Sequence, residues 1–482
     1  MTMDTASFQF LLFGLGVALI SNISRSSAWR SAVLLVASIV FLGLLAPNPI
    51  VLLPLIGFLL FGFAELVLIE RGWSGSLAWS VLGTVFVYVW LKKYTFLPEK
   101  IFLHSPYFTL GLSYIFFRVL HLLIEAKDRP GQRQVGVVAY LLYNLNFTTF
   151  ISGPIQRYDD FAEGQFAADP VALGPGVIGL QLERIVRGLF KVNVLAMLFD
   201  IVRTDAYSRI SQSLPLPPPL KLYAVFLLLT SYPLFLYANF SGYIDIVIAL
   251  ARLMRLRLPE NFDRPFSASS ALDFWNRWHM TLSNWLKAYV YNPLLLTLMR
   301  RISSPGLEPL LGVFCFFVTF FLIGVWHGRT TEFVVFGVLT GGGMSINKLW
   351  QLGLTRAMGR KSYKKLSNND LYNALGRGLN FIWFGFTLFW FWADWSRIDR
   401  IFHALSLGQW LGVLTGSWLL ATVALASWEW LRAALLSITA FQQPLLTSRY
   451  ARTVYATALG IVSLVVTTAL NQPAPAIVYK VF

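Results

Sequence analysis

Charged residues are scarce in this sequence. Asp, Glu, Lys and Arg make up 13% of its 482 residues, whereas soluble globular proteins contain roughly 25%. Hydrophobic residues make up 56%, above the roughly 45–50% of soluble chains. This composition excludes an ordinary soluble domain. Together with apolar runs long enough to cross a bilayer as helices, it predicts an all-α polytopic membrane protein.

Cysteine is almost absent as well. The single Cys315 excludes a disulfide within the chain and any metal site built from several cysteines. It lies inside an apolar run, Val-Phe-Cys-Phe-Phe. We therefore expect it to be a small packed side chain rather than a nucleophile.

The sequence also lacks the patterns of a nucleotide-binding loop and of a metal site. Gly341–Gly343 is not followed by the Lys-Ser/Thr of a nucleotide-binding loop, so we expect these glycines to permit close helix packing. His279 and His327 have only remote His or carboxylate residues to complete a metal site. We predict no metal site and no tightly bound cofactor.

The amino terminus carries no Lys or Arg. Met1–Ser7 contains Asp4 but no basic residue, whereas a cleavable signal peptide needs a basic segment before its apolar core. We therefore expect the first apolar run to be an uncleaved membrane span.

The rest of the sequence is basic, with a net charge of +16. Its Lys and Arg residues are scattered through short connections between apolar runs, as in cytoplasmic loops that face anionic lipid headgroups. We expect membrane lipids, and no nucleic acid, among the partners. The orientation of the first four segments stays open. If Arg25 is cytoplasmic and every segment crosses the membrane, Lys92, Lys93 and Lys100 lie outside, although basic residues are typical of cytoplasmic loops.

Apolar runs of about 20 residues, the length of a membrane-spanning helix, recur along the chain. We predict about 11 to 13 helical segments, several of them short enough to be tilted, broken or re-entrant. The candidates are 8–23, 31–46, 50–69, 77–91, 107–124, 135–151, 185–202, 223–250, 309–326, 333–350, 381–392, 410–431 and 454–470. No soluble domain, low-complexity tract or internal repeat interrupts them, which favours one domain over residues 1–482.

A few polar residues lie inside these runs. Asp245 must be paired, protonated or in contact with water at this depth. Arg118 and His121 are three residues apart and share one helix face, which we expect to point into the bundle. For His121 we favour a packing role over a catalytic one.

The stretch 272–293 fits neither a membrane span nor a soluble loop. It combines three tryptophans with Arg277, His279 and several other polar residues, although a charge in hydrocarbon costs about 2.5–3.5 kcal/mol. We predict a buried, partly hydrated helix whose polar groups face a cavity. A second histidine, His327, ends an apolar run further on.

Five ordered segments of the sequence form a specific set of motifs. They are Ser-Gly-Pro-Ile-Gln-Arg-Tyr at 152–158, Phe-Ser-Gly-Tyr-Ile-Asp-Ile at 240–246, Arg-Leu-Pro-Glu-Asn-Phe at 257–262, Phe-Trp-Asn-Arg-Trp-His-Met-Thr-Leu-Ser at 274–283 and Gly-Val-Trp-His-Gly at 324–328. Together they resemble the membrane-bound O-acyltransferase (MBOAT) family. The resemblance implies one acyltransferase domain over residues 1–482 with its motif-bearing core at 150–350, and helices arranged around a central tunnel.

Within that family, the motif at 274–283 looks closest to the subfamily that D-alanylates teichoic acids, with the alginate O-acetylation subfamily next. The residues after the last motif, 329–332 and 339–341, depart from the pattern of many relatives. The acyl group, D-alanyl or acetyl in type, and the acceptor polymer therefore stay open.

The resemblance also implies roles for individual residues. His327 is the expected general base, because a neutral imidazole accepts a hydroxyl proton near neutral pH, and Trp326 is expected to wall the site. His279 is the second catalytic candidate; it could orient the donor, share the proton or stabilise the oxyanion. Asn276, Arg277 and Trp278 complete the expected substrate-binding set. The alternative is that the polar residues of 272–293 have only a structural role and join helices through buried hydrogen bonds.

The implied reaction takes an acyl group from a cytoplasmic thioester, on coenzyme A or a carrier protein, to a hydroxyl outside a bacterial plasma membrane. The acceptor is a cell-envelope polymer or a relay protein. A transporter or flippase of a lipid-linked or acylated substrate would show the same apolar composition and intramembrane charges, so that hypothesis also stays open.

Overall fold

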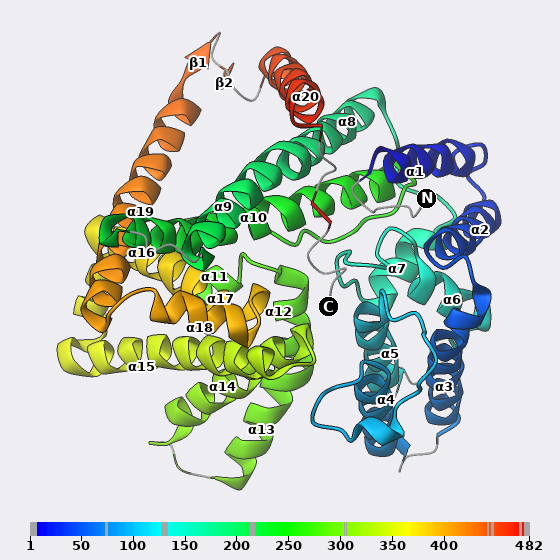
Figure 1. Ribbon diagram of the computed structural model, residues 1–482. Coiled ribbons are helices and arrows are strands. Elements are labelled where there is room, and N and C mark those ends of the chain that lie inside the picture. The colour runs from blue at the N-terminus through cyan, green and yellow to red at the C-terminus, as the bar shows by residue number, and fades with distance from the viewer. Residues whose placement is uncertain are drawn as a thin grey trace. The chain divides into compact units, whose positions relative to one another are not determined.

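The computed structural model is built almost entirely from helices (Figure 1). It describes residues 7–72, 76–126, 134–212, 217–302, 304, 306–440, 443–444, 448–471 and 475–476. Within this part, the only strands are β1 (Thr439–Ala440) and β2 (Gln443–Pro444), which form a two-residue antiparallel pair. The prediction of an all-α polytopic membrane protein is confirmed.

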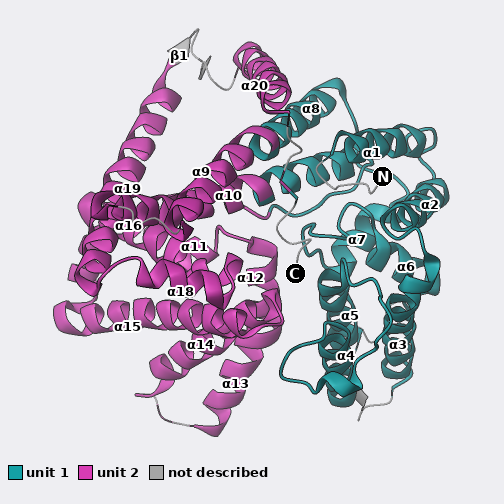
Figure 2. Cartoon of the chain, viewed as in Figure 1, with its two compact units in different colours: residues 1–192, 240–260, 476–482 teal, residues 193–239, 261–475 magenta. Residues whose placement is uncertain are grey.

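The chain divides into two compact units (Figure 2). Unit 1 contains residues 1–192, 240–260 and 476–482, and unit 2 contains residues 193–239 and 261–475. The long helix α10 (Pro218–Leu253) begins in unit 2 and ends in unit 1. That the whole chain forms one functional domain stays a prediction.

Eight complete helices belong to the described part of unit 1. They are α1 (Phe8–Ser21), α2 (Ser27–Leu45), α3 (Leu53–Glu70), α4 (Ser76–Leu91), α5 (Leu112–Ala126), α6 (Val137–Leu145), α7 (Tyr158–Gln165) and α8 (Pro175–Phe190). Helix α8 continues into a π-helix, Lys191–Ala196, whose later residues belong to unit 2.

Unit 2 contains the remaining helices. They are α9 (Met197–Ser211), α11 (Ala271–Trp275), α12 (Met280–Leu286), α13 (Asn292–Arg301), α14 (Glu308–His327), α15 (Thr331–Ser367), α16 (Asp370–Thr387), α17 (Phe389–Trp392), α18 (Trp395–His403), α19 (Leu407–Ser437) and α20 (Arg449–Leu470). The polar stretch 272–293 is thus broken into two short helices and a π-helical turn, Lys287–Tyr291, rather than one helix.

Six helices of the described chain are long and apolar enough to cross a membrane. They are α2, the segment Pro49–Glu70 that contains α3, α10, α14, α19 and α20. Most of the other predicted segments are shorter or interrupted helices, such as α1 and Leu77–Leu91, whereas 333–350 lies within the 37-residue helix α15. The broken segments expected from the sequence are therefore present.

Helix α6 ends earlier than predicted. The sequence suggested a span that reaches Ile151, but the helix stops at Leu145, so that boundary is wrong. The Asn146 side chain accepts hydrogen bonds from the backbone N–H and the hydroxyl of Thr148, at 3.2 and 2.8 Å. Asparagine competes with a helix in this way, because its side chain offers the backbone a local turn.

Arg118 stabilises the end of α6. Its guanidinium is 2% exposed and donates hydrogen bonds to the carbonyl oxygens of Tyr143, Asn144 and Thr149. The last carbonyls of a helix have no partner inside the helix. The expectation that Arg118 and His121 face the interior is confirmed, since His121 is 1% exposed and accepts a hydrogen bond from the Tyr158 N–H at 3.0 Å.

Asp245 is paired, as its depth required. Its carboxylate accepts hydrogen bonds from Arg184 at 2.9 Å and Lys191 at 2.8 Å. The helices that bear these groups meet closely, because a Cβ atom added to Gly188 would lie 2.7 Å from the carbonyl oxygen of Gly242. Asp245 therefore joins α8 and its π-helical extension to α10 within unit 1.

Glycines also bring α14 and α15 together. A Cβ atom at Gly324 would lie 2.2 Å from the Cα atom of Gly337, and one at Gly341 would lie 2.7 Å from the Phe317 carbonyl oxygen. Small residues permit such close helix contact in membranes. The expected packing role is confirmed for Gly341 and is wrong for Gly342, where an added Cβ atom would have nothing within 4 Å.

We expect Gly324→Ala to destabilise the protein by about 1–3 kcal/mol, the usual cost of overpacking, because the added methyl group meets the backbone of α15. The melting temperature of the purified protein in detergent measures this effect. Gly342→Ala is the matched control, since a Cβ atom there has nothing within 4 Å. Equal melting temperatures for the two variants would contradict the close crossing.

Candidate active site

Two of the sequence motifs pair with each other in unit 2. The Met280 N–H donates to the Asn261 carbonyl oxygen at 3.0 Å, and the Asp263 N–H donates to the Arg277 carbonyl oxygen at 2.9 Å. Between them, Phe262 and Trp278 form an isolated antiparallel β-bridge. This pairing fixes the segment 277–280 between α11 and α12.

His279 lies at the turn that the pairing creates. Its backbone is left-handed, with φ 45° and ψ 49°, a conformation that costs a non-glycine residue on the order of 1–3 kcal/mol. The side chain is 1% exposed. Burial lowers the pKa of the His279 imidazole to about 3, and a hydrogen bond to its own backbone carbonyl opposes that shift. The ring is therefore neutral at physiological pH.

Asn261 holds this turn from the other motif. It is fully buried, and its side-chain oxygen accepts hydrogen bonds from the backbone N–H of Thr281 at 3.1 Å and from its hydroxyl at 2.8 Å. The same oxygen lies 3.3 Å from Nδ1 of His279. Asn261 belongs to the motif at 257–262, but the sequence did not identify it as a site residue. The one signal for such a role is a hydrogen-bonding amide side chain inside a family motif.

His327 is the last residue of α14 and is 5% exposed. Aromatic side chains surround its ring, with ring centroids of Phe391 and Phe336 at 5.1 and 6.0 Å. The chain then extends through Gly328, where an added Cβ atom would lie 2.1 Å from the Phe333 ring. The Phe333 ring thus fills the space next to Gly328.

Trp326 lies close to both histidines. Its ring centroid is 6.4 Å from that of His279 and 4.7 Å from that of His327. The indole is 9% exposed. The structure therefore brings together three of the residues selected from the sequence, two on α14 and one on the paired turn.

A family comparison decides what this arrangement belongs to. The model of the MBOAT, membrane-bound O-acyltransferase family, matches residues 50–369, more than half of the chain and all five motifs. The chain belongs to the membrane-bound O-acyltransferase family. It is therefore an acyltransferase, and the predicted family is confirmed.

Several curated proteins that resemble the chain are named as enzymes that modify teichoic acid or alginate. The teichoic acid D-alanyltransferases of Bacillus subtilis and Streptococcus thermophilus are 27% and 29% identical to it, over 59% and 56% of this chain. The probable alginate O-acetylase of Pseudomonas fluorescens is 27% identical over 56% of this chain. The matched stretches cover 69%, 65% and 51% of these three proteins.

Trp278, a predicted substrate-binding residue, packs in an aromatic cluster of this acyltransferase. Its ring stacks on Phe274 with centroids 5.7 Å apart and contacts Phe262 and Phe384 edge-on at 5.1 and 4.9 Å. The side chain is 2% exposed. These contacts give Trp278 a structural role, and a role in binding substrate stays a prediction.

Asn276 and Arg277 lie on a more open side of the same stretch. Asn276 is exposed, and the Arg277 guanidinium donates to Asp273 at 2.7 Å and lies 3.8 Å from Asp263. The hydrogen bond to Asp273 raises the pKa of Arg277 above its usual value. These contacts do not join the residues to the histidines, so their substrate-binding roles also stay predictions.

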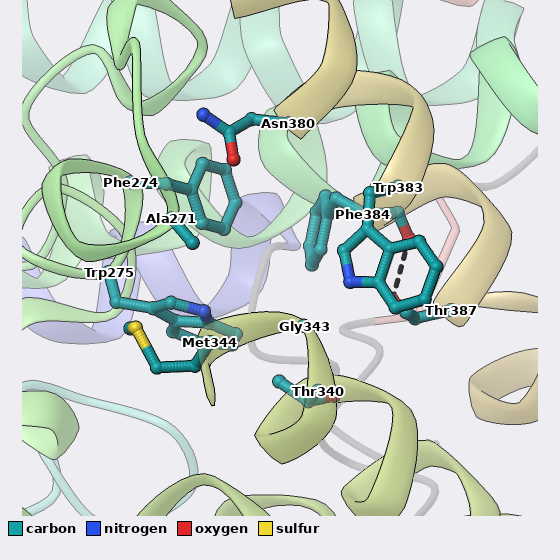
Figure 3. A pocket seen from close by; sticks show the side chains of 10 residues that line it. All are labelled: Ala271, Phe274, Trp275, Thr340, Gly343, Met344, Asn380, Trp383, Phe384 and Thr387. Atoms are coloured by element: carbon teal, nitrogen blue, oxygen red, sulfur yellow. Dashed lines mark hydrogen bonds between the residues drawn. The ribbon is translucent and has the colours of Figure 1, made fainter. Parts of the chain in front are cut away.

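A small pocket lies between α11, α15 and α16 (Figure 3). It is lined by Ala271, Phe274, Trp275, Thr340, Gly343, Met344, Asn380, Trp383, Phe384 and Thr387. Asn380 and Thr340 lie on opposite sides of it in the view. Phe274 and Trp275 belong to the motif that contains His279, but neither histidine lines this pocket.

Potential metal ligands and the cysteine complete the description of reactive side chains. Among the described residues, no three or more His, Cys, Asp or Glu side chains are grouped so that they could hold a metal ion. The one cysteine, Cys315, is buried and free in α14, as the sequence predicted.

We expect Trp278→Ala to destabilise the protein by about 3–5 kcal/mol, the usual cost of removing a large aromatic side chain from a core. Thermal unfolding in detergent measures the loss. Trp430→Ala is the control, because that tryptophan is 73% exposed in α19. A Trp278→Ala protein as stable as the control would contradict the structural role.

Proposed function

We propose that this acyltransferase moves an acyl group of the D-alanyl or acetyl type from a cytoplasmic thioester to a hydroxyl outside a bacterial plasma membrane. The acceptor is a cell-envelope polymer or a relay protein. The names of the relatives support this class of acceptor. The observation that carries the proposal is the burial of His279 and His327, whose ring centroids lie 6.4 and 4.7 Å from that of Trp326.

The chemistry requires one proton acceptor. The acceptor oxygen forms a bond to the acyl carbon, and the carbon–sulfur bond of the thioester breaks. His327 takes the hydroxyl proton as the carbon–oxygen bond forms and then returns it to the departing thiolate. A positioned base of this kind contributes typically about 10²–10⁴-fold to the rate.

His279 and Trp326 complete the site in this proposal. Trp326 forms part of the wall of the site, and its ring lies close to both imidazoles. His279 assists His327 or the developing oxyanion. Asn276, Arg277 and Trp278 take part in binding the substrates.

The co-substrate is an acyl thioester on coenzyme A or on a carrier protein, and no tightly bound cofactor is proposed. Because donor and acceptor lie on opposite sides of the membrane, the proposed reaction requires a tunnel through the protein, in a single acyltransferase domain whose motif-bearing core is residues 150–350. Broken, polar helices are tolerated in lipid only where they face protein or a wet cavity, and α11 and α12 fit that requirement.

A transporter or flippase would use the same apolar helices but would need no base. Membership of an acyltransferase family favours bond chemistry, and so does the pair of buried histidines.

We expect His327→Ala to lower polymer ester content at least about 100-fold, because the reaction loses its general base. Mass spectrometry of envelope polymers from cells that carry each variant gives the acyl group, the acceptor and the ester content together. His403→Ala is the control, since that histidine side chain is 80% exposed in α18. Normal esters in His327→Ala cells, with normal amounts of protein in the membrane, would exclude the proposed base.

A further inference from the structure

The Asn261 side-chain oxygen faces three nitrogen or oxygen atoms. They are the backbone N of Thr281 at 3.1 Å, the Thr281 hydroxyl at 2.8 Å and Nδ1 of His279 at 3.3 Å. All of them are buried. Buried polar groups of this kind are expensive to leave without partners, so the arrangement constrains which atoms bear hydrogen.

The backbone N–H of Thr281 decides the orientation of the amide. A backbone N–H can only donate, so the Asn261 atom that faces it must be the oxygen and not the NH₂ group. Amide orientation and histidine tautomer are ordinarily assigned from such networks. Here one obligatory donor fixes the amide, and the amide oxygen in turn can only accept from the histidine.

We infer that Asn261 is a positioning residue that holds neutral His279 with its hydrogen on Nδ1, so that Nε2 is the nitrogen that accepts hydrogen bonds or protons. The tautomer follows from the contacts alone. Its meaning for the reaction rests on the proposed function.

This tautomer narrows the role of His279. A neutral ring with hydrogen on Nδ1 cannot donate from Nε2, so it cannot stabilise an oxyanion there by donating a hydrogen bond. It can take a proton at Nε2 and become an imidazolium while Nδ1–H still donates to Asn261. Nε2 of His279 therefore acts as an acceptor, either of a proton shared with His327 or of a hydrogen bond that orients the donor, and proton uptake requires no rearrangement at Asn261.

The test uses the full chain labelled with ¹⁵N-histidine in lipid bilayers. Solid-state ¹⁵N NMR separates hydrogen-bearing from bare ring nitrogens, and comparison with His279→Gln identifies the His279 signals among the five histidines of the chain. We expect a hydrogen-bearing Nδ1 and a bare Nε2 at neutral pH. A hydrogen-bearing Nε2 in the wild-type protein would overturn the inference.

Three variants separate positioning from simple loss of structure. Asn261→Leu removes the side-chain acceptor and leaves only the backbone carbonyl of His279, so we expect part of the protein to change to the Nε2–H form. Asn261→Asp keeps an oxygen at the same place and should keep the hydrogen on Nδ1. Thr281→Val removes only the hydroxyl and leaves the backbone N–H, so it should also keep the hydrogen on Nδ1. An unchanged tautomer in a folded Asn261→Leu protein would show that Asn261 does not set it.

Ester content provides the functional arm. A wrong tautomer at a catalytic histidine greatly lowers the reaction rate. We therefore expect Asn261→Leu to lower the ester content about tenfold or more, and Asn261→Asp to restore much of it. Normal esters in Asn261→Leu would overturn the positioning role, whereas normal esters in His327→Ala would overturn the proposed function. The two failures are therefore distinguishable.

Discussion

The backbone pairing between residues 261–263 and 277–280 positions the second histidine of this enzyme. A left-handed residue between two short helices has little stability of its own. Two backbone hydrogen bonds and the Phe262–Trp278 bridge supply the missing constraint. Because the aromatic cluster around Trp278 packs on α16 through Phe384, the turn is held on both sides, and the His279 ring reaches Trp326.

The close packing of α14 and α15 positions the other histidine, His327. Gly324 and Gly337 let the two backbones meet, and three residues beyond Gly324 the ring of His327 packs against Phe336 of α15. In lipid, no hydrophobic force drives helices together, so close contact through small residues is a main source of helix association. The site therefore depends on glycines that take no part in the chemistry.

Two buried charged side chains of unit 1, Arg118 and Asp245, are paired within that unit. Arg118 stabilises the carbonyl end of α6, and Asp245 binds Arg184 and Lys191. An isolated charge in hydrocarbon is costly, so each such group requires a partner. These contacts connect helices at places where apolar packing alone would not specify one arrangement.

The sequence by itself determined the class of protein, the positions of the apolar helices, the family, and the selection of His279, Trp326 and His327, because composition, run length and motif order are local properties. It also required that Asp245 be paired, protonated or in contact with water, without deciding among these. Only the tertiary structure decided that Arg184 and Lys191 pair with Asp245, that α6 ends at Leu145, that Trp278 belongs to an aromatic cluster, and that Asn261 faces His279. Each of these depends on contacts between side chains or backbone groups whose geometry local sequence patterns do not specify.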